Sequence, residues 1–229
     1  MNEGKFRHEF KYLITQNQVD MLKARMSGIM QLDSHVFENG VYNICSLYFD
    51  DYYNRCFYEN LSGVDPREKY RIRIYNHDLS RISLECKRKE HGKTLKTSCL
   101  ITEDECKSLM SGLTDINPNA PPVMAKFQNE IRTKGMRPAI IVEYERIPYV
   151  YRTGNVRITL DTNLSSSSDT TEFLCGKISR RPVMPVGMQL LEVKYDEFLP
   201  DYIYHALQLE NLQQTSFSKY YLCRKYSMK

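Results

Sequence analysis

Charged side chains recur at every second position in five segments of this sequence. Between Glu68 and Tyr75, Arg71 and Arg73 alternate with tyrosine and isoleucine. The other segments contribute the alternating sets Arg7, Glu9 and Lys11; Glu85, Lys87 and Lys89; Arg157, Thr159 and Asp161; and Glu192 and Lys194. Because successive side chains of a β-strand point to opposite faces, each segment predicts a strand with one apolar face and one charged face of mixed sign.

A surface built this way has a definite chemistry. Arginine and lysine neutralise phosphate oxygens, and arginine often does so with two parallel hydrogen bonds. Carboxylates such as Glu9, Glu85 and Glu192 would repel phosphate unless a divalent cation lay between them. Mg²⁺ is usually held by one or two carboxylates together with substrate phosphates, which fits this mixture. For Glu9 and Glu85, a salt bridge to a neighbouring lysine or arginine stays open as the alternative.

The distribution of charge says more than its total. The 229 residues carry 32 Lys or Arg and 28 Asp or Glu, a formal net charge of +4, which does not indicate a nucleic-acid partner. Residues 67–98 alone hold ten Lys or Arg against four Asp or Glu. This segment predicts an anionic ligand. With 41% hydrophobic residues, the chain can still form a substantial core.

Other catalytic signatures are missing from the sequence. The five histidines show no spacing typical of a Ser-His-Asp or Cys-His nucleophile. The run His91-Gly92-Lys93-Thr94 is similar to the end of a phosphate-binding P-loop, but Lys87 stands where that loop needs its first glycine. The sequence therefore offers no candidate nucleophile.

Cysteine usage and hydropathy point to the cytoplasm. The seven cysteines include no CxxC pair, which argues against a zinc site and predicts reduced thiols. The first residues form no apolar signal segment, and no apolar run approaches the length of a membrane span. We expect a cytoplasmic protein for which membrane association would require a partner.

The periodicity of apolar residues predicts an α+β chain. The expected strands are 6–14, 41–50, 68–75, 82–89, 93–101, 138–146, 149–153, 156–162 and 188–195. The expected helices are 16–30, capped by Thr15; 52–62; 103–110, opened by the capping box of Thr102 and Glu105; one between Pro122 and Lys134; 200–212; and 218–226. Residues 165–169 are expected to form a flexible surface loop.

These elements predict one domain over residues 1–229 in which helices cover antiparallel meanders. Strands joined by short turns favour a closed or nearly closed sheet. Closing the sheet places its charged face in the lumen and leaves the apolar face for the helices. The alternative is an open sheet whose charged face lies in solvent. The density of Arg, Lys and Glu at central positions favours the closed form.

The sequence resembles the polyphosphate polymerase domain of the vacuolar transporter chaperone (VTC) family, within the triphosphate tunnel metalloenzymes. The matching segments, in the family's order, are Arg7–Tyr12, Ser46–Asp50, Lys69–Arg73, Leu84–Lys87, Tyr144–Arg146, Val156–Thr159, Leu190–Tyr195 and Phe217–Tyr220. The resemblance implies an eight-stranded antiparallel β-barrel tunnel with surrounding helices. It also implies a ligand that is the triphosphate of a nucleotide or an inorganic polyphosphate.

The resemblance also implies roles for individual residues. The expected catalytic set is Lys11, Arg71, Arg73, Lys87, Arg146, Arg157, Glu192 and Lys219. The expected phosphate ligands are Lys11, Arg71, Arg73, Lys87, Lys89, Lys96, Tyr144, Arg146, Arg157, Lys194, Ser218 and Lys219. The expected metal ligands are Glu192 above all, with Glu9 and Glu85, and the metal would be Mn²⁺ or Mg²⁺.

One position departs from the wider superfamily and narrows the function. The adenylate cyclase and thiamine triphosphatase branch opens with Glu-x-Glu-x-Lys, whereas Arg7 replaces the first glutamate here. Exchanging a carboxylate for a cation favours a longer anion and argues against cyclase chemistry. We expect transfer of the γ-phosphoryl group of ATP to a growing polyphosphate chain. The alternatives, in order, are a tripolyphosphatase or nucleoside triphosphatase, a polyphosphate-binding module without turnover, and an RNA-binding protein.

Overall fold

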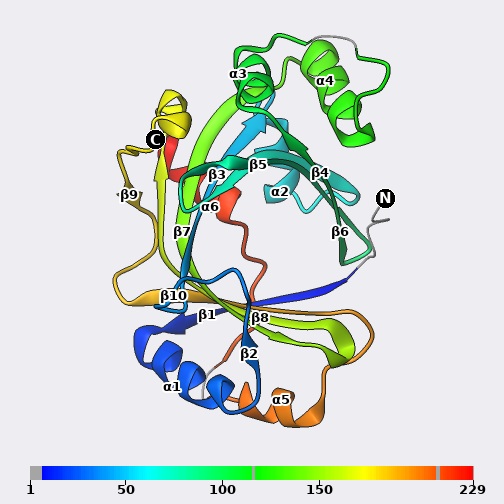
Figure 1. Ribbon diagram of the computed structural model, residues 1–229. Coiled ribbons are helices and arrows are strands. Elements are labelled where there is room, and N and C mark those ends of the chain that lie inside the picture. Colours follow the sequence, from blue (N-terminus) through cyan, green and yellow to red (C-terminus); the bar gives the residue numbers. More distant parts are fainter. Residues whose placement is uncertain (1–6, 115–116, 210–211, 229) are drawn as a thin grey trace.

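The computed structural model describes residues 7–114, 117–209 and 212–228. Its centre is a curled antiparallel sheet in which eight strands follow the order β1-β10-β8-β7-β3-β4-β5-β6 (Figure 1). The eight strands are β1 (His8–Thr15), β3 (Tyr42–Asp50), β4 (Arg67–Tyr75), β5 (Asp78–Glu90), β6 (Lys93–Ile101), β7 (Arg137–Tyr151), β8 (Val156–Ser167) and β10 (Met188–Tyr195). The short strands β2 (Gln31–Leu32) and β9 (Arg181–Pro182) pair with β7 and β8.

The two outer strands of this sheet, β1 and β6, approach each other at one end. Arg7 and Thr94 form an antiparallel bridge, in which the amide of Arg7 donates to the carbonyl of Thr94 at 3.1 Å and the reverse bond measures 3.3 Å. This bridge closes the curl around a lumen. The predicted fold class, an eight-stranded antiparallel tunnel with surrounding helices, is confirmed.

The helices are α1 (Gln16–Ser27), α2 (Arg55–Leu61), α3 (Glu103–Ser111), α4 (Pro122–Lys134), α5 (Asp201–Ala206) and α6 (Lys219–Ser227). The helices α3 and α4 lie on one outer side of the curled sheet, and α1 and α5 lie on the opposite side (Figure 1). The two helix starts that were predicted from a capping residue are present. Thr15 and Thr102 each complete a capping box with the residue three positions later. Within the described ranges, no helix is both long and apolar enough to cross a membrane.

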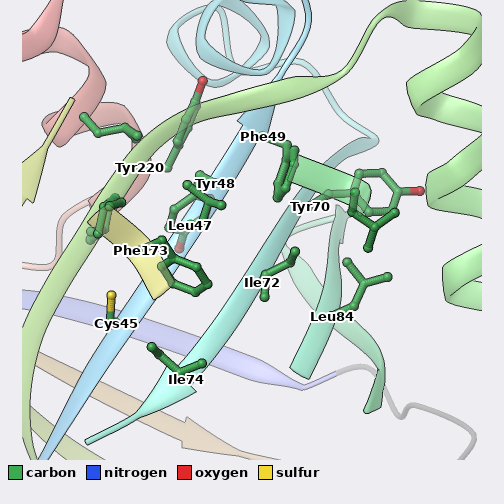
Figure 2. Close-up of a cluster of buried hydrophobic side chains, with 14 of the residues drawn as sticks. Cys45, Leu47, Tyr48, Phe49, Tyr70, Ile72, Ile74, Leu84, Phe173 and Tyr220 are labelled. Carbon is green, nitrogen blue, oxygen red and sulfur yellow. The ribbon is translucent and has the colours of Figure 1, made fainter. Parts of the chain in front are cut away.

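Two separate apolar clusters cover the outer face of the sheet. One contains residues of α1 and α5 packed on β1, β8 and β10. The other lies between β3, β4 and β5 and the helices α3 and α4; Leu47, Ile72 and Leu84 are fully buried there (Figure 2). Because the apolar side chains point outward into these clusters, the charged side chains between them point into the lumen. The open-sheet alternative is therefore wrong.

Two of the predicted elements are wrong in their extent. The expected strands 138–146 and 149–153 form one strand, β7, which continues through Pro148; the carbonyl of Pro148 accepts the amide of Asp33 at 3.0 Å. The expected loop 165–169 is wrong, because β8 extends to Ser167 and its three serines are buried. Pairing with β7 and β9 stabilises that serine run, and such long-range pairing overrides local propensity.

The predicted ends of two further elements cannot be compared fully. Phe6, the expected first residue of the first strand, and residues 210–211 of the expected helix 200–212 lie outside the described residues. In the structure, α5 begins at Asp201 and ends at Ala206, before the predicted end at residue 212.

Candidate phosphate-binding site

The lumen of the curled sheet contains a cavity of about 780 Å³. Its walls come from β1, β3, β4, β5, β7 and β10, from the end of α2 and the turn after it, from the start of β6, from the segment 214–218 and from the start of α6. The charged residues that line it are Glu9, Lys11, Asp65, Arg67, Lys69, Arg71, Arg73, Lys87, Lys89, Arg146, Glu192, Lys194 and Lys219. The alternation of charged and apolar positions along each strand thus places one charged set inside a single enclosure.

Glu192 lies where four cations converge. Its carboxylate accepts from Lys194 Nζ at 2.8 Å, from Lys219 Nζ at 3.0 Å and from Arg146 Nη2 at 3.4 Å. Lys11 Nζ lies 3.8 Å from the same carboxylate. Burial raises the pKa of Glu192, but the surrounding lysines and Arg146 outweigh it, and the pKa lies well below its usual range. Glu192 is therefore a buried, permanent anion among cations.

Asp161 is a second buried anion beside Glu192. Its two carboxylate oxygens accept from Nε and Nη2 of Arg146 at 2.6 and 2.7 Å, and Lys219 Nζ lies 2.5 Å away. This bidentate geometry fixes the plane of the guanidinium. Burial raises the pKa of Asp161, while Arg146 and Lys219 lower it further than burial raises it. Asp161 thus orients two of the cations that face the cavity.

Glu85 performs a similar task for the arginines of β4. It accepts from Nε of Arg71 at 2.8 Å and from Lys96 Nζ at 3.0 Å, and lies 3.9 Å from Nη1 of Arg73. Burial would raise the pKa of Glu85, yet Arg71 and its neighbours hold it far below its usual value. The salt-bridge reading of Glu85 is the one found in the structure.

Hydroxyl groups of the adjacent strands β3 and β7 hold the same two arginines. Nη1 of Arg71 donates to the hydroxyl of Tyr48 at 2.8 Å. Nη2 of Arg73 donates to the hydroxyl of Tyr144 at 3.3 Å, and its Nε donates to Ser46 Oγ at 3.0 Å. Burial raises the pKa of Tyr144, while Arg146, Arg73 and Lys219 lower it to a net value below the ordinary one. Its hydroxyl is therefore a good hydrogen-bond donor to an anion.

Glu9 lies between two lysines on the β1 side of the cavity. Lys87 Nζ lies 2.9 Å from both of its oxygens, and Lys11 Nζ lies 3.0 Å away. Burial lowers the pKa of Lys87 to about 7 even though Glu9 acts in the opposite direction. The β5 wall therefore contains an amine that an incoming anion would help to keep protonated.

The segment before α6 completes the site. The amide of Thr215 donates to the carbonyl of Lys11 at 2.8 Å, and Lys11 Nζ donates to the carbonyl of Phe217 at 2.8 Å. Ser218 caps α6 through the amide of Tyr221 at 3.3 Å. The segment thus runs beside β1 into the lumen and delivers Lys219 to Glu192 (Figure 1).

Most of the expected site residues meet in this cavity. Those that line it are Glu9, Lys11, Arg71, Arg73, Lys87, Lys89, Tyr144, Arg146, Glu192, Lys194, Ser218 and Lys219. Three do not: Glu85 and Lys96 are engaged with each other behind Arg71, and Arg157 binds Asp33 Oδ2 at 2.9 Å. Arg157 also donates to the hydroxyl of Tyr42 at 2.7 Å, at a part of the barrel away from the cavity.

Sequence reasoning missed four residues of the site: Asp161, Arg67, Lys69 and Tyr48. The strand alternation already placed the first three on the charged face, since Asp161 shares parity with Thr159, and Arg67 and Lys69 share parity with Arg71. Tyr48 gave no signal, because a tyrosine in an apolar strand is typical of a core residue.

The residues present could hold a metal only together with phosphate. Among the described residues, no three His, Cys, Asp or Glu side chains gather into a metal site. Glu192 provides a carboxylate, and its cross-strand partner Thr159 has a buried hydroxyl oxygen with no hydrogen-bond partner in the described part of the chain. One or two carboxylates plus phosphate oxygens is the set that Mg²⁺ usually takes. The donor set therefore fits a metal that arrives with its substrate.

The chain is similar to solved structures and to one family model. A protein from Hippeastrum, assigned as an adenylyl cyclase and described as having a dominant triphosphatase activity, is 14% identical, with 96% of each chain covered and a TM-score of 0.56. A protein from Bacillus halodurans, assigned as an adenylate cyclase, is 13% identical over 90% of this chain and 88% of its own, with a TM-score of 0.49. No curated protein matches the chain significantly in sequence. The sequence model of the VTC domain matches residues 6–228, so the chain belongs to the VTC domain family.

Proposed function

We propose that this protein is a metal-dependent polyphosphate polymerase that transfers the γ-phosphoryl group of ATP to a polyphosphate chain held in the lumen. The observation that carries the proposal is the composition of the cavity wall. Among the described residues, ten Lys or Arg side chains line the cavity against three carboxylates, Glu9, Asp65 and Glu192. Such an excess suits an anion with many charges closely spaced along a chain.

The reaction needs positioning rather than a nucleophile from the protein. A terminal oxygen of the acceptor chain would attack the γ-phosphorus of ATP, and a new P–O bond would form as the bond to the β,γ-bridging oxygen breaks. ADP then leaves with the electron pair. Arg71, Arg73 and Arg146 are each locked by carboxylate or hydroxyl partners, so they would meet the equatorial oxygens without reorganising.

A divalent cation, Mn²⁺ or Mg²⁺, would be held by Glu192, with Glu9 as the second carboxylate and phosphate oxygens as the remaining ligands. When bound, it neutralises charge that develops on the transferring group. Lys219 and Lys194 now bind Glu192 at 3.0 and 2.8 Å. Both amines would be available to phosphate once a cation took their place.

The test uses purified protein and ATP labelled at the γ-phosphate, incubated with Mn²⁺, Mg²⁺ or EDTA, and products resolved on a gel. We expect a metal-dependent ladder of long chains. Glu192→Gln should slow its formation by about 10²–10³-fold, the usual loss when one group that stabilises the transition state is removed. Glu145→Gln is the matched control, because Glu145 is exposed on β7 and does not line the cavity.

A tripolyphosphatase or nucleoside triphosphatase is the second candidate. It is favoured by Glu9, a carboxylate in the cavity that could orient a water molecule, and by the triphosphatase activity described for the Hippeastrum protein with this fold. Free labelled phosphate without a ladder would move the assignment to hydrolase. Binding of polyphosphate without either product, at any metal, would reduce the protein to a binding module.

A further inference from the structure

Cations face one another in three cross-strand pairs at the end of the lumen where β4 begins and β5 ends. In the register of these strands, Lys69 lies opposite Lys87 and Arg67 lies opposite Lys89. On the far side of β5, Lys87 lies opposite Lys96 of β6. Like charges directly opposite each other destabilise a sheet. Their accumulation here indicates that something anionic compensates them.

Two of these cations already have carboxylates, and three do not. Lys87 binds Glu9 at 2.9 Å, and Lys96 binds Glu85 at 3.0 Å. Within the described part of the chain, Arg67, Lys69 and Lys89 form no ion pair with a carboxylate. We call these three residues the rim cluster.

The partners of the rim cluster are neutral. Lys69 Nζ donates to Asn60 Oδ1 at 2.6 Å and to Ser218 Oγ at 3.1 Å, and lies 5.1 Å from the centre of the Tyr220 ring. Arg67 Nη1 donates to the carbonyl of Val64 at 2.7 Å. Asp65, a carboxylate of the cavity wall, accepts the amide of His91 at 2.9 Å.

The rim cluster is unfavourable in the free protein. Burial lowers the pKa of Lys69 to about 7, and Arg67 and Lys87 lower it further by repulsion. Burial and the neighbouring Arg67 also lower the pKa of Lys89. An anion placed among the three would relieve both the burial cost and the repulsion.

The rim cluster also lies at the open end of the cavity. The turns at Gly63 and Gly92 line the cavity and are exposed, and the bond between His91 and Asp65 joins them. Arg67 lies four residues from Arg71 on the same strand face, a span of about 13 Å at the usual rise of a strand. An anion reaching both residues must therefore be an extended chain.

We propose that the rim cluster is an outer subsite for the phosphates of an inorganic polyphosphate chain beyond those held around Glu192, and that it makes the protein favour long chains over tripolyphosphate. The inference rests on the proposed function for the identity of the anion. It further identifies the end of the lumen by which the polyphosphate chain leaves, between the turns at Gly63 and Gly92. It also identifies the residues that distinguish long chains from short ones.

The test is equilibrium binding of inorganic tripolyphosphate and of medium-chain inorganic polyphosphate, without ATP. The double variant Lys69→Met/Lys89→Met should bind the polyphosphate about tenfold more weakly or worse, since hydrogen bonds to charged groups are lost. Its affinity for tripolyphosphate should fall by a clearly smaller factor than its affinity for polyphosphate. Arg88→Met is the matched control, because Arg88 lies between Lys87 and Lys89 on the opposite face of β5 and pairs with Glu90 at 3.0 Å.

Three outcomes would overturn the inference. Equal losses for the two anions would assign the lysines to the inner site or to general attraction. If Arg88→Met lost as much affinity for polyphosphate as the double variant, general electrostatic attraction would explain the effect. The same conclusion would follow if the double variant lost as much affinity for a single-stranded oligonucleotide of matched charge. If the wild-type protein binds tripolyphosphate as tightly as polyphosphate, the outer subsite is refuted and the proposed function is not. If it binds neither anion, the proposed function is refuted as well.

Discussion

Asp161 holds Arg146 with two hydrogen bonds and contacts Lys219, and all three side chains are buried. Asp161→Asn leaves both cations short of a counter-charge in the interior. Breaking one partner of a buried ion pair costs about 3–5 kcal/mol, so we expect the free energy of unfolding in urea to fall by about that amount. Glu145→Gln, at an exposed position of β7, should change it by less than about 0.5 kcal/mol. A loss as small as the control's would contradict the role assigned to Asp161.

Lys69 provides the opposite case, a charge whose removal should stabilise the protein. Its pKa is about 7 when folded and about 10.4 when unfolded, so the unfolded chain binds more protons between these values. Stability from this group therefore rises with pH from 7 to 10. Lys69→Met should raise Tm by a few degrees at pH 6, and the gain should shrink toward pH 10. A gain that is independent of pH would mean that the charge is not its source.

The charged strand faces could be predicted because their period is local. Residues two apart in one strand lie on the same face whatever strands lie beside it, as Arg71 and Arg73 do, and also Glu192 and Lys194. Their partners could not be predicted, because Glu85 meets Lys96 and Asp161 meets Arg146 only through the order of strands in the sheet. The expected ligands that fail to line the cavity, such as Arg157, were misplaced for this reason.

At the scale of elements, α6 determines whether the site is complete. Asp50 accepts the amides of Cys56 and Phe57 at the start of α2 and also the hydroxyl of Tyr220 on α6. The next residue back from Tyr220 is Lys219, which reaches Glu192. This link fixes α6 against α2 and sets the depth of Lys219 in the lumen.

Tyr220→Phe removes the link and leaves the ring in place. We expect the free energy of unfolding to fall by about 1–3 kcal/mol, since the Asp50 carboxylate loses one buried partner. Phosphoryl transfer, measured with saturating ATP, should fall by about tenfold, because a displacement of Lys219 affects positioning. Tyr221→Phe, on the same helix, is the control and should leave both values near those of the wild type. Normal turnover in a destabilised Tyr220→Phe would separate α6 from catalysis.

At the scale of the whole molecule, the net charge of +4 understates the charge enclosed in the lumen. Tripolyphosphate at about 100 times its Kd should stabilise the fold by about 2.7 kcal/mol. For a chain of 229 residues this is a rise in Tm of roughly 5–10 °C. In salt near 1 M, where the Debye length is about 3 Å, at least half of the rise should disappear. Thermal melts with sulfate at matched ionic strength test this, and an equal rise with sulfate would refute recognition of a phosphate chain.

The bond between Thr215 and Lys11, together with the pairing of β1 and β10, joins segments about as far apart in sequence as this fold allows. Contacts of such long range are slow to form, because the intervening chain must be ordered first. During translation, Lys11 leaves the ribosome long before Glu192 and Lys219. A nascent chain therefore cannot complete this cavity until residue 219 has emerged, and no ligand can occupy the whole cavity before that point of synthesis.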